Sequence, residues 1–285
     1  AHIALVMCDP GDVVLVPNPG YPVFGMGPQL MGAKVETYPL YAENNFLPDF
    51  ADIPEKTAKA AKFMIISYPA NPVCSVADDS FYEKAIAFAK KYNVILLHDN
   101  AYSDIIFGGK EGKSFLSYKG AMEVGIEFYS LSKSYDMTGM RISFALGNKD
   151  VIQMFRKVRS QIDYGIFLPI QKAAVAALTG PQDNVKEQCR IYEERNYALC
   201  RGMSSIGWKI PDGQGTMFVW APIPENYTSS ERFTLDLMEK TGMIVTPGTA
   251  FGNLGEGYVR IALVHPVETI EKVVRIVKES GILEA

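Results

Sequence analysis

Short apolar runs alternate along the first half of the chain with segments in which apolar residues recur at helical spacing. Most of the runs are nearly continuous in apolar residues, as expected for strands that are covered on both faces. Segment 81–92 is typical of the intervening stretches, since Phe81, Ala85, Phe88 and Ala89 share one helical face and lysines occupy the other. This alternation predicts an α/β fold with a mainly parallel sheet covered by helices. The predicted strands are 13–17, 34–38, 63–67, 94–98, 126–130 and 142–146.

The pattern changes near residue 149. Helical segments follow one another at 151–160, 169–178 and 184–206, with Gly180-Pro181 between the last two. Short strands and helices are mixed after that point. We therefore expect a large domain at 1–180 and a smaller C-terminal α+β domain at 181–285. The later predicted elements are strands 208–210, 216–220, 244–246 and 258–264, and helices 230–240 and 267–280.

Composition and charge exclude several classes of partner. Hydrophobic residues make up 48% of the chain, and 28 Lys+Arg against 32 Asp+Glu give a net charge of −4 with no basic run, so no nucleic-acid partner is expected. No apolar run approaches the ~20 residues that span a bilayer, so no membrane partner is expected. The cysteines and histidines lack the spacing of a disulfide framework or a metal site. A reducing cytoplasm is the expected location.

Polar residues follow three of the predicted strands. Asn71 comes after 63–67, and Asp99 and Tyr102 come after 94–98. Lys133 follows 126–130, and Arg141 lies eight residues beyond it. Ligands of open α/β sheets gather outside the carboxyl ends of the strands, so we expect these side chains to share one edge of the sheet. His98, next to Asp99, is expected to point to the opposite side of its strand and to be structural.

The chemistry of this set fits one cofactor. Lys133 at a strand end can form a Schiff base with an aldehyde. Ser130, Ser132 and Arg141 can neutralise and hydrogen-bond a phosphate. Asp99 can keep a pyridine nitrogen protonated, and Tyr102 and Asn71 can donate to a phenolate oxygen. An aldehyde that carries a phosphate, a pyridine and a phenolate is pyridoxal 5′-phosphate (PLP).

The order of these residues resembles the PLP-lysine signature of the class I/II aminotransferases, a fold-type-I family. Ser130-Leu-Ser132-Lys133 followed by Gly139-Met-Arg141 carries the resemblance, which extends over essentially the whole chain. By this resemblance Tyr21 stacks on the pyridine ring, and Arg260 clamps the α-carboxylate of the substrate with its planar fork. The resemblance also implies a homodimer with active sites at the subunit interface.

The expected function is PLP-dependent transfer of an amino group between an amino acid and a 2-oxo acid, with Lys133 as the catalytic residue. Segments 162–167 and 246–251 look most like the LL-diaminopimelate/alanine-type branch of the family. Dicarboxylate-specific relatives use an arginine after the active lysine, whereas 161–171 contains no Arg or Lys. An aspartate aminotransferase that uses this device is therefore not expected, and neutral, aromatic or diaminopimelate-like donors stay open.

Several alternatives accompany this interpretation. In the family, a Gly-rich turn and a helix N-terminus hold the PLP phosphate, and the resemblance begins just after them, so the N-terminal segment is expected to be missing. A PLP lyase or decarboxylase on the same fold and a truncated, non-catalytic aminotransferase-like module both stay open. Taken singly, Lys133, Asp99 and the serines also fit surface, capping and turn roles. A dinucleotide-binding protein is disfavoured, because no Gly-x-Gly-x-x-Gly follows the first strand.

Overall fold

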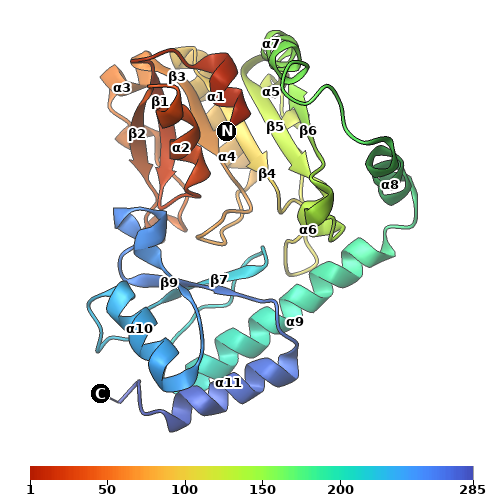
Figure 1. The fold of residues 1–285 in the computed structure, drawn as a ribbon. Coiled ribbons are helices and arrows are strands. Elements are labelled where there is room, and N and C mark those ends of the chain that lie inside the picture. Colours follow the sequence, from red (N-terminus) through yellow and green to blue (C-terminus); the bar gives the residue numbers. More distant parts are fainter. Residues whose placement is uncertain (285) are drawn as a thin grey trace.

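The computed structural model describes residues 1–284 and contains a six-stranded and a three-stranded sheet, in the upper and lower parts of Figure 1. The larger sheet has the order β2-β1-β3-β4-β5-β6, and its strands are parallel except β6, which runs antiparallel to β5. The predicted mainly parallel sheet is thus confirmed. Its strands are β1 (Val13–Asn18), β2 (Lys34–Pro39), β3 (Ala61–Ile66), β4 (Ile95–Asn100), β5 (Gly125–Ser130) and β6 (Ser143–Gly147).

Helices cover both faces of this sheet. Since successive strand residues point to opposite faces, neighbouring residues of one strand pack against different helices. Leu15 and Met64 pack with residues of α3, α4 and α5 on one face. Val14 and Phe63 pack with residues of α1, α2 and α7 on the other face, which is the one toward the viewer in Figure 1. The helices of this part are α1 (His2–Met7), α2 (Val23–Leu30), α3 (Glu55–Ala60), α4 (Asp79–Tyr92), α5 (Ala121–Val124), α6 (Leu131–Ser134) and α7 (Lys149–Arg159).

The smaller sheet is antiparallel, with the order β7-β9-β8. Helices α9, α10 and α11 pack against it around a set of buried residues that we call the second core, which includes Leu199, Phe233, Val259, Ile261 and Ile270. Helix α8 stands apart at the right of Figure 1. The elements are α8 (Leu168–Thr179), α9 (Asp183–Ser205), β7 (Phe218–Pro222), α10 (Ser230–Thr241), β8 (Thr246–Pro247), β9 (Tyr258–Ala262) and α11 (Val267–Glu279).

One predicted strand, 208–210, is wrong, and another, 244–246, is a strand only at Thr246. Segment 208–210 has no regular secondary structure, although Trp208 and Ile210 alternate with a lysine as strand residues do. Both side chains are buried in the second core, and the backbone N–H of Ile210 donates to Ser204 Oγ at 3.1 Å instead of to a neighbouring strand. Alternation here reflects burial of two side chains, because no partner strand is within reach.

Side chains from the large-sheet part of the molecule pack in the second core. Tyr102, Ile105 and Phe107 follow β4 of the large sheet, yet their side chains lie in the second core. The backbone of this segment is hydrogen-bonded to the segment before β7, through Thr216 N to Ile105 O at 2.8 Å and Phe107 N to Gln214 O at 2.9 Å. Within the described residues, no helix is both long and apolar enough to cross a membrane.

Candidate active site

The carboxyl ends of β3, β4 and β5 lie side by side, because these strands are parallel neighbours. A cavity of about 340 Å³ lies beyond them. Its wall contains every site residue that the sequence analysis predicts, drawn from both parts of the molecule. These residues are Tyr21, Asn71, Asp99, Tyr102, Ser130, Ser132, Lys133, Arg141 and Arg260.

Five further residues of this wall were not predicted from the sequence: Phe24, Ser67, Ala101, Thr138 and Phe218. Ser67 ends the predicted strand 63–67, so the rule that ligands gather beyond strand ends could have found it. Phe218 and Ala101 carry no polar group, and their positions follow only from the packing of the two parts of the molecule.

Lys133 lies in α6, a helix of four residues that follows β5 directly. Ser130 caps this helix, since its Oγ accepts a hydrogen bond from Ser132 N at 3.2 Å. Ser130 therefore caps a helix, which is one of the ordinary structural roles of serine. Its hydroxyl proton is still available to a phosphate oxygen. Among residues 1–284, no hydrogen-bond or ion-pair partner holds the Lys133 amine.

Arg141 lines the same cavity and follows a short 3-10 helix at Thr138–Met140. Its backbone has a φ of 52°, in the left-handed region that residues with a side chain rarely adopt. The guanidinium donates from Nη1 to the Thr138 carbonyl oxygen at 3.1 Å, and its remaining N–H groups are free for another acceptor. Ser130, Ser132 and Arg141 together provide two hydroxyls and a cation in the wall of the cavity.

Asp99 and Tyr102 occupy the end of β4 and the loop after it. Burial raises the pKa of Asp99, against the opposing charge of His98 and the backbone N–H of Ala101. Burial also raises the pKa of Tyr102, so its phenol is protonated at neutral pH and can donate a hydrogen bond. Ser67 Oγ donates to the Asp99 carbonyl oxygen at 3.0 Å and ties the end of β3 to β4.

Arg260 on β9 enters the cavity from the second part of the molecule. Its Nη1 donates to Asn71 Oδ1 at 2.8 Å, which leaves the amide N–H groups of Asn71 as donors. Phe218 and Phe251 lie against the guanidinium, with ring centroids 4.1 Å and 4.7 Å from Cζ. Burial lowers the pKa of Arg260, because the charged guanidinium is partly removed from water. An anion in the cavity would compensate that loss by pairing with the guanidinium.

Tyr21 stands at the rim of the cavity. It is 43% exposed, and its ring meets the edge of Phe24 at a centroid distance of 5.9 Å. This contact fixes the phenol from one side and leaves much of the ring uncovered, as a residue that stacks on a ligand requires.

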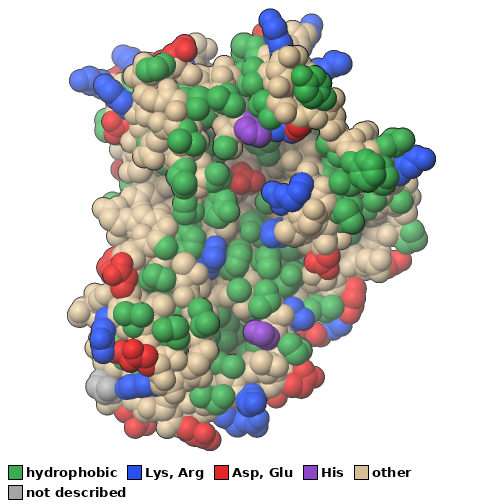
Figure 2. Space-filling model, viewed as in Figure 1, with side chains coloured by type: hydrophobic (Ala, Val, Ile, Leu, Met, Phe, Trp, Pro, Cys, Tyr) green, Lys and Arg blue, Asp and Glu red, His purple; other side chains and the backbone are tan. Residues whose placement is uncertain are grey.

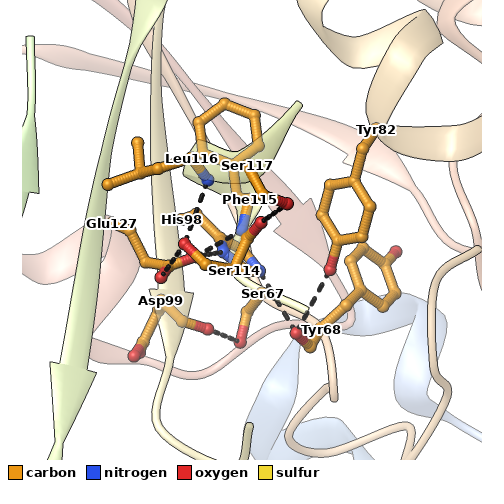
Figure 3. A network of polar contacts seen from close by, with 10 residues as sticks. All are labelled: Ser67, Tyr68, Tyr82, His98, Asp99, Ser114, Phe115, Leu116, Ser117 and Glu127. Atoms are coloured by element: carbon orange, nitrogen blue, oxygen red, sulfur yellow. Dashed lines mark hydrogen bonds and ion pairs between the residues drawn. The ribbon is translucent and has the colours of Figure 1, made fainter. Parts of the chain in front are cut away.

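His98 forms a buried ion pair beneath the site (Figure 3). Its Nδ1 faces Glu127 Oε2 at 3.0 Å and its Nε2 faces the Tyr68 carbonyl oxygen at 3.1 Å. Both ring nitrogens therefore face oxygen atoms, which fixes the orientation of the imidazole. Glu127 also accepts from Ser114 Oγ at 2.8 Å and Phe115 N at 2.7 Å. This network joins β4, β5 and the loop that leads to Asn71, so His98 has a structural role.

Comparison with known proteins gives a consistent picture. The family model described as aminotransferase class I and II matches residues 1–277. The LL-diaminopimelate aminotransferase of Moorella thermoacetica is 47% identical over 274 residues, which cover 96% of this chain and 70% of that protein. That of Halothermothrix orenii is 45% identical over 282 residues, covering 99% and 72%.

Solved structures agree in fold. Substrate-bound BacF from Bacillus subtilis superposes with a TM-score of 0.95 at 39% identity, covering 98% of this chain and 71% of BacF. An aminotransferase from Staphylococcus aureus gives 0.93 at 32% identity, covering 100% and 75%. The family match spans nearly the whole chain, and its relatives are enzymes. This chain therefore belongs to the class I and II aminotransferases, PLP-dependent enzymes of fold type I that transfer an amino group between an amino acid and a 2-oxo acid.

Proposed function

We propose that Lys133 is the catalytic residue of this aminotransferase and that the other eight predicted residues hold the cofactor and the amino acid around it. The observation that supports this assignment is the convergence of all of them on one cavity. Ser130, Ser132 and Arg141 form the phosphate end, while Asp99, Tyr102, Asn71 and Tyr21 surround the ring. Arg260 receives the α-carboxylate.

The donor set fits PLP. Asp99 has a carboxyl that burial makes costly to ionise, and within residues 1–284 no side chain is hydrogen-bonded to it. A protonated pyridine nitrogen is the partner that such a carboxylate lacks. Tyr102 and the free N–H groups of Asn71 are donors, as a phenolate oxygen requires.

The residues then divide the work of amino transfer. When bound, PLP supplies the electron sink that chemistry at Cα requires. Lys133 Nζ acts as the general base that removes the Cα proton of the amino acid. Arg260 orients the substrate by its carboxylate, with the guanidinium held in place by Asn71 and by two aromatic rings. Asp99 keeps the ring nitrogen protonated.

LL-diaminopimelate is the amino donor that the relatives favour, because six curated proteins with 45% identity or more carry that activity in their names. The absence of Arg and Lys from 161–171 agrees with a donor other than aspartate. The measurement is a donor panel with 2-oxoglutarate as acceptor, in which LL-diaminopimelate should give the highest kcat/KM and aspartate a far lower one.

A homodimer is the proposed assembly. Ile162, Tyr164, Phe167, Leu168, Val175 and Leu178 form an exposed apolar patch on α8 and the segment before it. Figure 2 shows hydrophobic side chains gathered over α8. Patches of this kind mark protein–protein contacts, and a second copy of the chain is the partner that the family implies.

The domain division and the location are also proposals. A PLP-binding domain at 1–180 and a small domain at 181–285 are supported by the two sheets, since β6 ends before residue 180 and β7 begins after it. The cytoplasm stays a prediction from cysteine usage.

The test of the catalytic assignment combines trapping with product analysis. PLP is added to the chain, the visible spectrum is recorded, and borohydride reduction is followed by peptide mapping. The label is expected on Lys133, and Lys133→Ala should lose both the label and turnover. Lys149→Ala, which removes an exposed lysine at the start of α7, is the matched control.

Each outcome has a clear meaning. Stoichiometric oxo acid together with pyridoxamine phosphate supports transamination. Carbon dioxide or an elimination product without pyridoxamine phosphate would indicate a decarboxylase or lyase. Undiminished transamination by Lys133→Ala would refute the assignment, and a wild-type chain that captures no PLP would indicate a non-catalytic module.

A further inference from the structure

One carboxylate outside the cavity wall accepts hydrogen bonds from three hydroxyl groups. Asp104 Oδ2 receives Ser134 Oγ at 2.5 Å, Tyr129 OH at 2.9 Å and Ser103 Oγ at 3.1 Å. Hydrogen bonds to an ionised acceptor are roughly twice as strong as neutral ones. Burial and the Asp104 carboxylate raise the pKa of Tyr129, so its hydroxyl is a donor at neutral pH.

The donors come from two places in the chain. Ser103 is the neighbour of Asp104, so its bond stays within one loop. Tyr129 on β5 and Ser134 at the end of α6 lie on the segment that carries Lys133, and Ser134 is next to that lysine. Asp104 itself lies two residues beyond Tyr102. The carboxylate therefore connects the Lys133 segment to the loop after β4.

Pairing with β4 holds β5 as far as Tyr129, and Lys133 lies four residues beyond that point, outside the sheet. Helix α6 has only four residues, and the lysine amine has no partner of its own among the described residues. The other polar contacts of this turn are made by Thr138 Oγ1, which donates to the Ser132 carbonyl oxygen at 2.8 Å, and by Tyr135, which bonds to Gln182. Neither contact reaches the end of β4, which carries Asp99, or the loop after it, which carries Tyr102.

We propose that Asp104 is a positioning residue, whose carboxylate acts through Ser134 and Tyr129 to hold Lys133 in register with the ring-binding residues of β4. This inference rests on the proposed catalytic role of Lys133. Loss of the contact should slow both capture of PLP and proton removal at Cα, because small displacements of a reacting group cost large factors in rate. Arg260 is untouched, so substrate carboxylate binding should not change.

The test compares Asp104→Ala, Ser134→Ala and the double variant with the wild type, and uses Ser103→Ala as the matched control. Ser103→Ala removes a hydroxyl from the same carboxylate oxygen without releasing the Lys133 segment. The first readout is the rate at which the cofactor-free chain captures PLP, followed by the visible band. The second is the division of any loss between kcat and the KM for the amino acid.

We expect Asp104→Ala and Ser134→Ala to slow capture and to lower kcat roughly 10- to 100-fold, with KM nearly unchanged. The double variant should be no slower than Asp104→Ala, because both changes break one contact. Ser103→Ala should stay within about twofold of wild type. The unfolding midpoint of each cofactor-free variant reports whether it folds, and Ser134→Ala decides the question if Asp104→Ala does not fold.

Wild-type rates in Ser134→Ala, or additive losses in the double variant, would overturn the positioning role. An equal loss in Ser103→Ala would also overturn it, since the carboxylate would then act only on its own loop. These results are separable from failure of the proposed function. If the wild type captures PLP without any label on Lys133, both proposals fall, whereas a labelled Lys133 with unaffected variants removes the positioning role alone.

Discussion

A buried carboxyl without a side-chain partner costs a folded chain stability as long as it is ionised. Asp99 comes close to this case, because the residue is half-buried, burial raises its pKa, and only the N–H of Ala101 is hydrogen-bonded to its carboxyl among the described residues. The residue that we assign to the pyridine nitrogen is thus held at a cost to the cofactor-free protein. Stability and function are opposed at this one side chain.

Replacement of Asp99 by Asn should therefore stabilise the cofactor-free chain at neutral pH and weaken PLP binding. A carboxyl with a raised folded-state pKa contributes stability at low pH that is lost as the pH rises through that pKa, so the advantage of Asn should vanish in acid. We expect the midpoint of thermal unfolding to rise by about 2–4 °C, the shift that ~1 kcal/mol produces. The exposed Asp52→Asn serves as control, and a lower midpoint for Asp99→Asn would contradict the argument.

The ion pair between Glu127 and His98 predicts a pH dependence of stability opposite to that of Asp99. Burial acts to raise the pKa of Glu127, but hydrogen bonds from His98, Ser114 and Phe115 outweigh it and lower the pKa. Such a carboxyl stabilises the fold above its ordinary pKa, and the stabilisation is lost as the pH falls through the folded-state pKa. Glu127→Gln should cost about 1–3 kcal/mol at neutral pH, because an amide with one acceptor oxygen replaces a buried carboxylate that accepts hydrogen bonds from His98, Ser114 and Phe115.

Urea unfolding over a pH series measures this effect. The difference between wild type and Glu127→Gln should be full at neutral pH and shrink in acid. Ser114→Ala removes one hydroxyl from the same carboxylate and should cost less. Equal stability of Glu127→Gln and wild type at neutral pH would show that the pair contributes nothing.

At the scale of elements, α4 illustrates how a local signal sets a helix boundary. Asp78 caps α4, since its carboxylate accepts from Phe81 N at 2.9 Å. Asp78→Ala should cost about 1 kcal/mol of unfolding free energy, while Asp78→Ser should retain most of it because serine is also a good cap. Urea unfolding of the two variants checks the prediction, and equal losses would show that the cap does not contribute.

Strands and helices with strong local patterns could be predicted from the sequence. All six strands of the large sheet were predicted, most of them because strands covered on both faces are nearly continuous in apolar residues. Strand β2 lacks that pattern, since Lys34 and Glu36 are exposed. The predicted strand at 208–210 is wrong for a physical reason. A strand needs a partner strand, and the residues that surround Trp208 are decided by the tertiary packing of the second core.

The candidate site divides in the same way. Residues that follow strands, such as Asp99 and Lys133, can be found from the sequence because strand ends meet at one edge. The partners that hold them cannot. Glu127 lies 29 positions from His98 and Ser134 lies 30 from Asp104, and these pairs depend on the register of neighbouring strands and loops.

At the scale of the whole molecule, the apolar patch around α8 predicts the assembly. Phe167 and Val175 are 72% and 61% exposed. A double change to Asp should place charge in the contact between two copies and shift the protein from twice the chain mass to 31.5 kDa in sedimentation equilibrium. Leu30→Asp, at an exposed leucine of α2, is the control that should leave the mass unchanged. A double variant that keeps the wild-type mass would place the dimer contact elsewhere.

The large-sheet part and the second core both contribute residues to the cavity, and this affects how a substrate binds. Arg260 stands between Val259 and Ile261, both buried in the second core, and Tyr102 lies in that core as well. Asp99 and Lys133 belong to the large sheet and the helix that follows it. An amino acid that meets Arg260 with its carboxylate and Lys133 with its Cα proton bridges the two parts and favours one angle between them. Binding of the carboxylate at Arg260 can thereby help to align Cα with Lys133. A molecule that contacts only one of these two groups does not favour any one angle between the two parts.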